Sequence, residues 1–280
     1  CSPMMRVIAA TERWARSSVV VLPATSRAAT TTTAAIHAAT SATTGSQLLM
    51  RADRMRATMD SAMRACAMGM TTALIYPPSS YSTTDELVAL AREVAKYGGI
   101  YASHMRDEGK GVVGAVRELI EISERGGLPG EIFHLKVAYT PGWGILMDSI
   151  RQTVEAARAR GVDVAADMYL YTAGGTGLEA TIPSWAFEGG SDSLRARLTN
   201  PAIRARLKRE LGTGSPGWWN IVESSGGWDR IVAWCRAQLA LRNHQQPLHR
   251  ERDAFIEPQL LLEAILAETE GALGARPHVV

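Results

Sequence analysis

The feature that most constrains the fold is a set of four short apolar segments that recur about every thirty residues. They begin at residues 71, 99, 131 and 162. Parallel strands need a crossover connection, usually a helix, and one strand–helix–strand unit takes about thirty residues. The spacing therefore predicts a parallel sheet whose strands are Thr71–Tyr76, Gly99–Ser103, Glu131–Leu135 and Val162–Met168.

The residues between these segments have the periodicity of amphipathic helices. Thr83 with Glu86 has the form of a capping box, and Gly126-Gly127 and Gly161 are typical helix ends. Four such units predict a (β/α) barrel or an open doubly wound sheet, and both folds bind ligands at the carboxyl ends of their strands. The apolar positions are Leu87, Leu90, Ala91, Val94 and Ala95, then Val112, Val113, Val116, Leu119 and Ile120, then Leu146, Ile150, Val154 and Ala157.

Two of the predicted strands end in the same short motif, a histidine followed two residues later by a positively charged residue. The first motif holds His104 and Arg106, and the second holds His134 and Lys136. Side chains two apart on a strand share a face, and neighbouring parallel strands lie about 4.8 Å apart. If these two strands are neighbours, both imidazoles can reach one metal ion.

Composition limits the classes of function. The formal net charge of +2 argues against nucleic acid or a membrane surface as partner. Three widely spaced cysteines favour a reducing compartment without a disulfide framework. No apolar run reaches the roughly eighteen residues of a membrane span. We therefore expect a cytoplasmic protein with a small-molecule substrate, and the oligomeric state stays open.

Both ends of the chain differ from its middle. Residues 1–52 contain a single acidic residue and a Thr/Ala-rich tract, which indicates a disordered or frame-shifted segment. Residues 53–211 carry the strand–helix repeat. Residues 212–280 are less regular, and we expect an irregular helical tail there.

The strand-end phrases resemble those of the N-acyl-D-amino-acid deacylases (D-aminoacylases) of the amidohydrolase superfamily. The resemblance implies a partial (β/α)8 TIM-like barrel of about four βα units, between irregular N-terminal and C-terminal regions. It also implies a zinc-dependent amidohydrolase that acts on non-peptide C–N bonds. The expected reaction is hydrolysis of an N-acyl-D-amino acid by metal-bound hydroxide, giving a D-amino acid and a carboxylate. The matching phrases are Ala67–Pro78, Tyr97–Glu108, Phe133–Lys136 and Asp167–Thr176.

Matched position by position, the resemblance implies that His104 and His134 are zinc ligands. Neutral imidazole binds zinc well, and a catalytic zinc keeps one position open for water. Lys136 and a tyrosine, Tyr169 or Tyr171, would hold the substrate. Arg106 is a second candidate cation for a substrate carboxylate.

A structural role competes with this interpretation of the two cations. Both could form ordinary ion pairs at the barrel mouth, and the candidate partners are Asp107, Glu108 and Asp167.

The chain also departs from the family pattern. It contains no His-x-His pair, and Cys66 lies at the wrong end of a strand for a ligand. The family's catalytic aspartate has no match, so the catalytic residue stays unassigned. We therefore expect a fragment that holds about strands four to seven of eight and has little or no activity.

Two alternatives stay open. One is another amidohydrolase, a cyclic amidase similar to dihydroorotase or hydantoinase, although Thr71–Pro77 lacks the lysine that such enzymes carboxylate. The other is a non-catalytic half-barrel that pairs with another chain, because an exposed sheet edge favours association.

Overall fold

The computed structural model describes residues 19–23, 45–171, 173–215, 217–227, 230, 233–234 and 278–279. At its centre lies a five-stranded sheet with the strand order β1-β2-β3-β4-β5. The first pair is antiparallel and the following three pairs are parallel, so the predicted α/β class with a parallel sheet is confirmed. The strands are β1 (Val19–Pro23), β2 (Ala67–Ala73), β3 (Ile100–His104), β4 (Gly130–Ile132) and β5 (Val164–Ala166).

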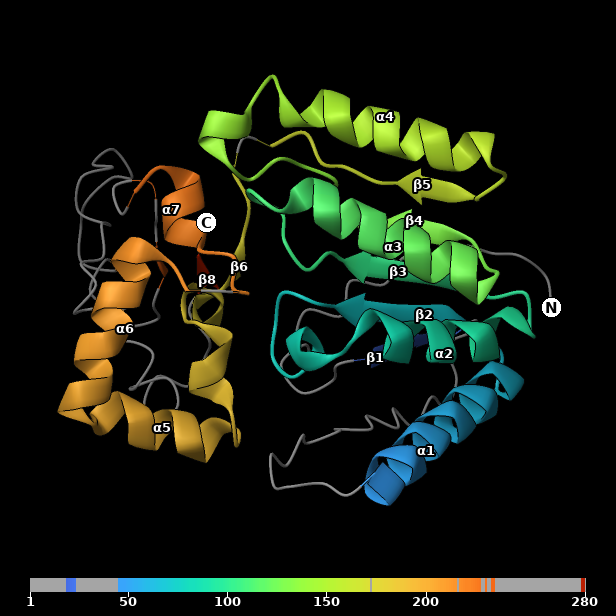
Figure 1. Cartoon of the computed structure of the whole chain (residues 1–280), viewed down its shortest axis with the longest axis horizontal. Coiled ribbons are helices and arrows are strands. Elements are labelled where there is room, and N and C mark those ends of the chain that lie inside the picture. The colour runs from blue at the N-terminus through green and yellow to red at the C-terminus, as the bar shows by residue number, and fades with distance from the viewer. Residues whose placement is uncertain are drawn as a thin grey trace, which may run out of the picture.

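Helices connect the parallel strands in the predicted alternation. Figure 1 shows α2, α3 and α4 side by side over one face of the sheet. The Thr83 side chain accepts a hydrogen bond from the Glu86 N–H at 3.2 Å, which confirms the predicted cap at the start of α2. The bounds are α1 (Gly45–Arg64), η2 (Ser79–Tyr81), α2 (Thr84–Ala95), α3 (Val112–Gly126), η3 (Thr140–Gly142) and α4 (Leu146–Ala159).

The main core lies between the sheet and these helices. The apolar positions predicted for the helices are buried or packed against it. Each fully buried aliphatic side chain contributes about 1.5–3 kcal/mol through the area removed from water. The fully buried residues of this core include Met70, Leu87, Leu90, Tyr101, Ile122, Ile132 and Ile150.

A smaller cluster of helices and short strands lies on the side of the sheet where the parallel strands end (Figure 1). Its own core includes Leu198, Leu207 and Val222. A hydrogen bond from the Tyr81 hydroxyl to the Ser184 carbonyl, at 2.7 Å, links this cluster to the part of the chain that forms the sheet. Its elements are β6 (Thr176–Gly177), η4 (Leu178–Thr181), η5 (Ser184–Phe187), α5 (Ser191–Thr199), α6 (Pro201–Thr213), α7 (Ile221–Ser225), β7 (Ala233–Trp234) and β8 (His278–Val279).

The predicted segment boundaries stay predictions. The smaller cluster runs across the boundary expected between residues 211 and 212. Most of the predicted segments 1–52 and 212–280 lies outside the described residues.

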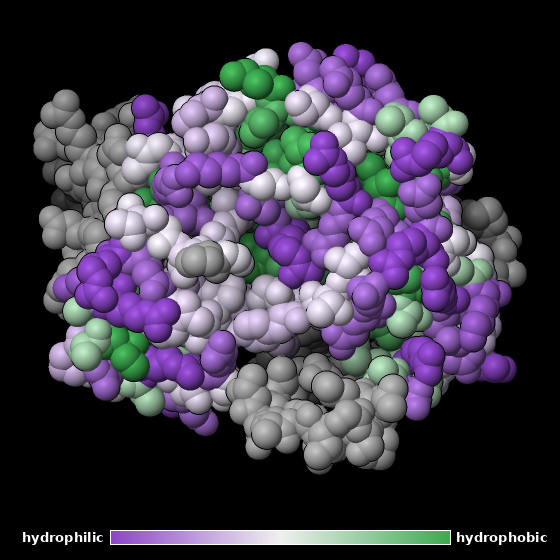
Figure 2. All heavy atoms as spheres, viewed as in Figure 1, coloured by the Kyte–Doolittle hydropathy of each residue, from purple (hydrophilic) through white to green (hydrophobic). Residues whose placement is uncertain are grey.

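Figure 2 shows hydrophilic side chains over most of the helical face. Among the described residues, no helix combines the length and the apolar character that a bilayer crossing requires.

Candidate metal centre

The structure places the imidazoles of His104 and His134 side by side. Their strands are parallel neighbours, with Ser103 of β3 opposite Ile132 of β4. The ring centroids are 4.5 Å apart. Nδ1 of His104 and Nε2 of His134 contact each other directly. One nitrogen from each strand end therefore points toward a common place, as the spacing predicts.

The backbone at His134 differs from the predicted strand. Strand β4 ends at Ile132, and His134 has a φ of 43°, in the left-handed region that is uncommon for residues other than glycine. Its N–H donates to Oδ1 of Asp167, and the Leu135 N–H donates to the Asp167 carbonyl at 2.8 Å. Asp167, which follows β5, thus stabilises the turn that presents this imidazole.

A buried carboxylate lies next to His134. Glu108 is only 3% exposed, and its Oε1 atom is 3.2 Å from Nδ1 of His134. Its Oε2 atom is 2.5 Å from Nζ of Lys136. Burial alone would raise the pKa of Glu108, but its contacts with His134 and Lys136 hold that pKa below its usual range. The sequence named Glu108 as one of three partners for Lys136 and gave no sign of its contact with His134.

The charge state of His104 suits a metal ligand. Burial, followed by the neighbouring His134, lowers the pKa of His104 from 6.5 to about 4. The imidazole is therefore neutral at pH 7, which is the form that binds metal ions.

The other predicted site residues differ in their distance from the pair. Lys136 lies beside it, with Nζ 2.9 Å from Nδ1 of His134 and 5.6 Å from the ring centre of Tyr169. The Tyr169 ring is 6.4 Å from that of His134, and burial raises the pKa of its hydroxyl. Tyr171 is 81% exposed, at the rim of the site.

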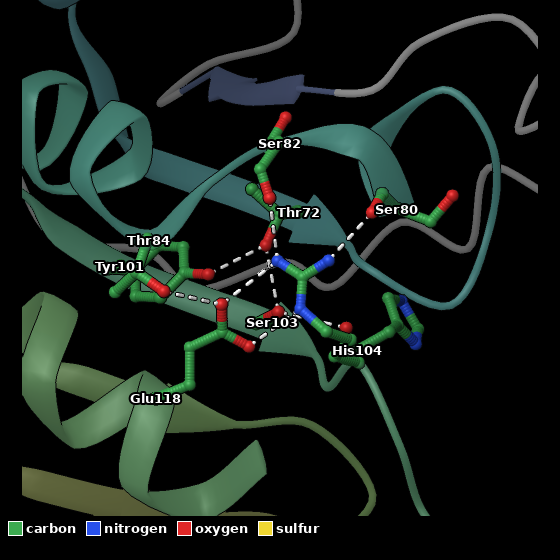
Figure 3. A network of polar contacts seen from close by, with 9 residues as sticks. Thr72, Ser80, Ser82, Thr84, Tyr101, Ser103, His104 and Glu118 are labelled. Carbon is green, nitrogen blue, oxygen red and sulfur yellow. Dashed lines mark hydrogen bonds and ion pairs between the residues drawn. The ribbon is translucent and has the colours of Figure 1, made fainter. Parts of the chain in front are cut away.

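Arg106 faces away from this group. Its Nε and Nη2 atoms each donate to Glu118 at 2.9 Å. Nη1 donates to the Ser80 carbonyl at 2.8 Å, and Nη2 also donates to the Ser82 carbonyl at 2.9 Å. Figure 3 shows Ser80, Ser82 and Glu118 converging on this guanidinium.

These four bonds engage most of the donors of Arg106. Turning the side chain toward a substrate would break a two-pronged ion pair. This geometry argues against the predicted role of Arg106 in substrate binding, and we interpret the residue as a structural clamp.

The donor set fits the imidazole half of a zinc site. Two imidazole nitrogens converge, whereas a structural or catalytic zinc has about four ligands. Within the described ranges, no group of three or more His, Cys, Asp or Glu side chains lies around one point. Cys66 precedes β2, at the opposite end of the strand from the histidines. The cyclic-amidase alternative gains no support, because β2 contains no lysine.

Comparison with known proteins confirms the resemblance found in the sequence. No family model matches the chain. A curated D-aminoacylase of Alcaligenes xylosoxydans xylosoxydans is 40% identical over 125 residues, which cover 45% of this chain and 25% of that protein. An N-acyl-D-glutamate deacylase of the same organism is 36% identical over 115 residues, covering 41% and 23%.

A solved structure is also similar. It is an N-acyl-D-glutamate deacylase of Bordetella bronchiseptica, complexed with zinc and a phosphonate inhibitor. It has 31% sequence identity and a TM-score of 0.44, and the match covers 48% of this chain and 27% of that one. The chain thus spans about a quarter of the length of the relatives it matches. Over that part it is homologous to D-aminoacylases, which are amidohydrolases that act on amide C–N bonds.

Proposed function

We propose that this chain carries part of the active site of a zinc-dependent N-acyl-D-amino-acid deacylase. The reaction is hydrolysis of the amide bond of an N-acyl-D-amino acid to a D-amino acid and a carboxylate. The observation that carries the proposal is the contact between Nδ1 of His104 and Nε2 of His134 at the ends of adjacent parallel strands. It lies in a chain that is 40% identical to a D-aminoacylase over 125 residues.

The proposed architecture is a segment of a (β/α)8 barrel. The parallel strands are paired in chain order, and the connecting helices lie over one face of the sheet (Figure 1). A barrel segment has both features, whereas a doubly wound sheet reverses its strand order and has helices on both faces.

His104 and His134 would hold the zinc ion in this proposal. When bound, zinc polarises the amide carbonyl and lowers the pKa of water. The chain's own contribution is to present both nitrogens in the right form and direction. Burial keeps His104 neutral, and Asp167 fixes the turn that carries His134.

Lys136 would bind the substrate carboxylate. Its ammonium has three donors, of which Glu108 engages one at 2.5 Å and the His134 carbonyl accepts a second at 3.2 Å. The third donor would reach a carboxylate placed beside the histidine pair. Tyr169 covers one side of the ammonium, and the exposed Tyr171 would contact the substrate at the rim.

For the chain by itself we propose metal and substrate binding with little or no turnover. Two imidazoles supply only half of a four-coordinate zinc site, and the sequence has no His-x-His pair to add further nitrogens.

Calorimetric titration of the full chain tests these proposals. We expect zinc binding that is lost in H104N and in H134N, and a preference of the zinc-loaded chain for N-acetyl-D-methionine over its L-enantiomer. Zinc binding unchanged in both variants would contradict the metal site, and equal binding of the enantiomers would contradict the substrate. Release of D-methionine is measured in parallel, and rapid turnover would show that the chain supplies a complete site.

A further inference from the structure

The carboxylate of Glu108 lies on the opposite side of the His134 ring from His104. Nε2 of His134 faces His104, whereas Nδ1 faces Oε1 of Glu108 at 3.2 Å. The Glu108 backbone carbonyl also accepts a hydrogen bond from the Ala138 N–H at 2.7 Å. Glu108 is therefore tied to the segment after β4 through both its side chain and its backbone.

Of the two neutral tautomers of His134, only the one with its proton on Nδ1 can donate to Oε1 of Glu108. In the described part of the chain, Oε1 is buried without an aligned hydrogen bond, and its ion-pair partner is Nδ1 of His134. A buried anionic oxygen without a donor costs free energy. A neutral imidazole carries its proton on one nitrogen only. A proton on Nδ1 would satisfy Oε1 and leave the Nε2 lone pair pointing toward His104.

Lys136 favours the opposite form. Its Nζ atom is 2.9 Å from Nδ1 of His134, and an ammonium can only donate. That bond would require the imidazole proton on Nε2, where it would block a metal ion. Glu108 competes for the same ammonium through Oε2, at the shorter distance of 2.5 Å and with opposite charge. One carboxylate oxygen thus engages Lys136, and the other lies where it can accept a proton from Nδ1.

We propose that Glu108 is a positioning residue that holds His134 as the Nδ1-protonated tautomer and directs its Nε2 lone pair to the metal. This inference rests on the proposed zinc site. Metal-bound histidines usually donate their second ring N–H to a carboxylate, a carbonyl or water, and loss of that partner typically lowers metal affinity 10–100-fold.

Spectroscopic titration of the full chain with Co²⁺ as a zinc substitute tests the metal part of the proposal. We expect E108Q to lower Co²⁺ affinity about 10–100-fold, and E108D to restore part of it. The same change at an exposed glutamate of α3, E121Q, is the matched control and should leave the affinity as it is. Wild-type affinity in folded E108Q would overturn the proposal.

Nitrogen NMR of the imidazole rings tests the tautomer without any metal. We expect the His134 signals of the wild-type chain to report a protonated Nδ1 and an unprotonated Nε2, and those of E108Q to shift toward the other form. A wild-type ring protonated on Nε2 would overturn the proposal. If E108Q does not fold, E108Q/K136M removes the unpaired ammonium and takes its place in both measurements.

The histidine variants separate this inference from the proposed function. If H104N and H134N abolish Co²⁺ binding while E108Q does not weaken it, only the role of Glu108 is wrong. If H104N and H134N bind Co²⁺ as the wild type does, the metal site itself is wrong and the role of Glu108 is wrong with it.

Discussion

Strands β3 and β4 lead into the same phrase, a histidine and then a cation two residues later, but the two cations have different surroundings. Arg106 spans Glu118 of α3 and the carbonyls of Ser80 and Ser82. Lys136 instead shares the buried carboxylate of Glu108 with His134. The same spacing thus leaves Lys136 beside its histidine but lets Arg106 turn away from His104, toward Glu118.

The chemistry of the two side chains suits this difference. The guanidinium of arginine is a planar fork that can bridge a carboxylate and carbonyl oxygens together, whereas the ammonium of lysine is a compact charge with rotatable donors. Arginine thus serves as a clamp between a loop and a helix. Lysine instead places its ammonium between the Glu108 carboxylate and His134.

The largest expected effect is at Lys136, and it tests whether the buried pair is coupled. K136M leaves the Glu108 carboxylate without its cation, and removal of one partner from a buried ion pair costs about 3–5 kcal/mol. Urea denaturation should show this loss in the free energy of unfolding. The double variant E108Q/K136M should lose less than the sum of the single variants. Strictly additive losses would contradict a coupled pair.

A smaller effect is expected at Arg106, which tests whether the clamp is only structural. The Arg106 side chain is 30% exposed and that of Glu118 is 14% exposed, so water moderates the loss. R106L should lower the free energy of unfolding by about 2–3 kcal/mol, and R106K should lie between R106L and the wild type. The metal affinity of folded R106L should match the wild type. Loss of metal binding with an intact fold would place Arg106 in the site after all.

The smallest effect is expected in the hydroxyl network beside the clamp, which Figure 3 shows around Thr72, Tyr101 and Ser103. Burial raises the pKa of the Tyr101 hydroxyl to about 12. An unfolded tyrosine ionises near pH 10. The contribution of the neutral Tyr101 hydroxyl to the free energy of unfolding is therefore fully present below pH 10 and is lost as the pH rises toward 12.

At pH 11 the expected loss is about 1 kcal/mol. Urea denaturation between pH 9 and 11.5 measures it, and Y101F should show a weaker dependence on pH. An equal dependence in Y101F would show that other groups cause the alkaline loss.

Local patterns in the sequence predicted the sheet, its helices and the meeting of His104 with His134. Periodicity and strand spacing are properties of short segments, and the parallel order follows from the connections. The left-handed turn at His134 was not predictable in this way. It depends on Asp167, which is 33 residues further along the chain.

The two carboxylate partners were equally hard to predict. Glu118 of α3 lies 12 residues after Arg106 and meets it in an ion pair at 2.9 Å. Glu108 meets His134 because the segment after β3 lies next to the segment after β4, where the Ala138 N–H bonds to the Glu108 carbonyl. Of the three carboxylates that the sequence offered, packing selects Glu108 for Lys136, whereas Arg106 pairs with Glu118, which was not among the three.

Anomalous scattering from a zinc-soaked crystal tests the central claim most directly, namely that one metal ion lies between the two strand ends. The account predicts a zinc peak about 2.0–2.1 Å from both Nδ1 of His104 and Nε2 of His134. Imidazoles that lie apart, or zinc bound only at other positions, would contradict it.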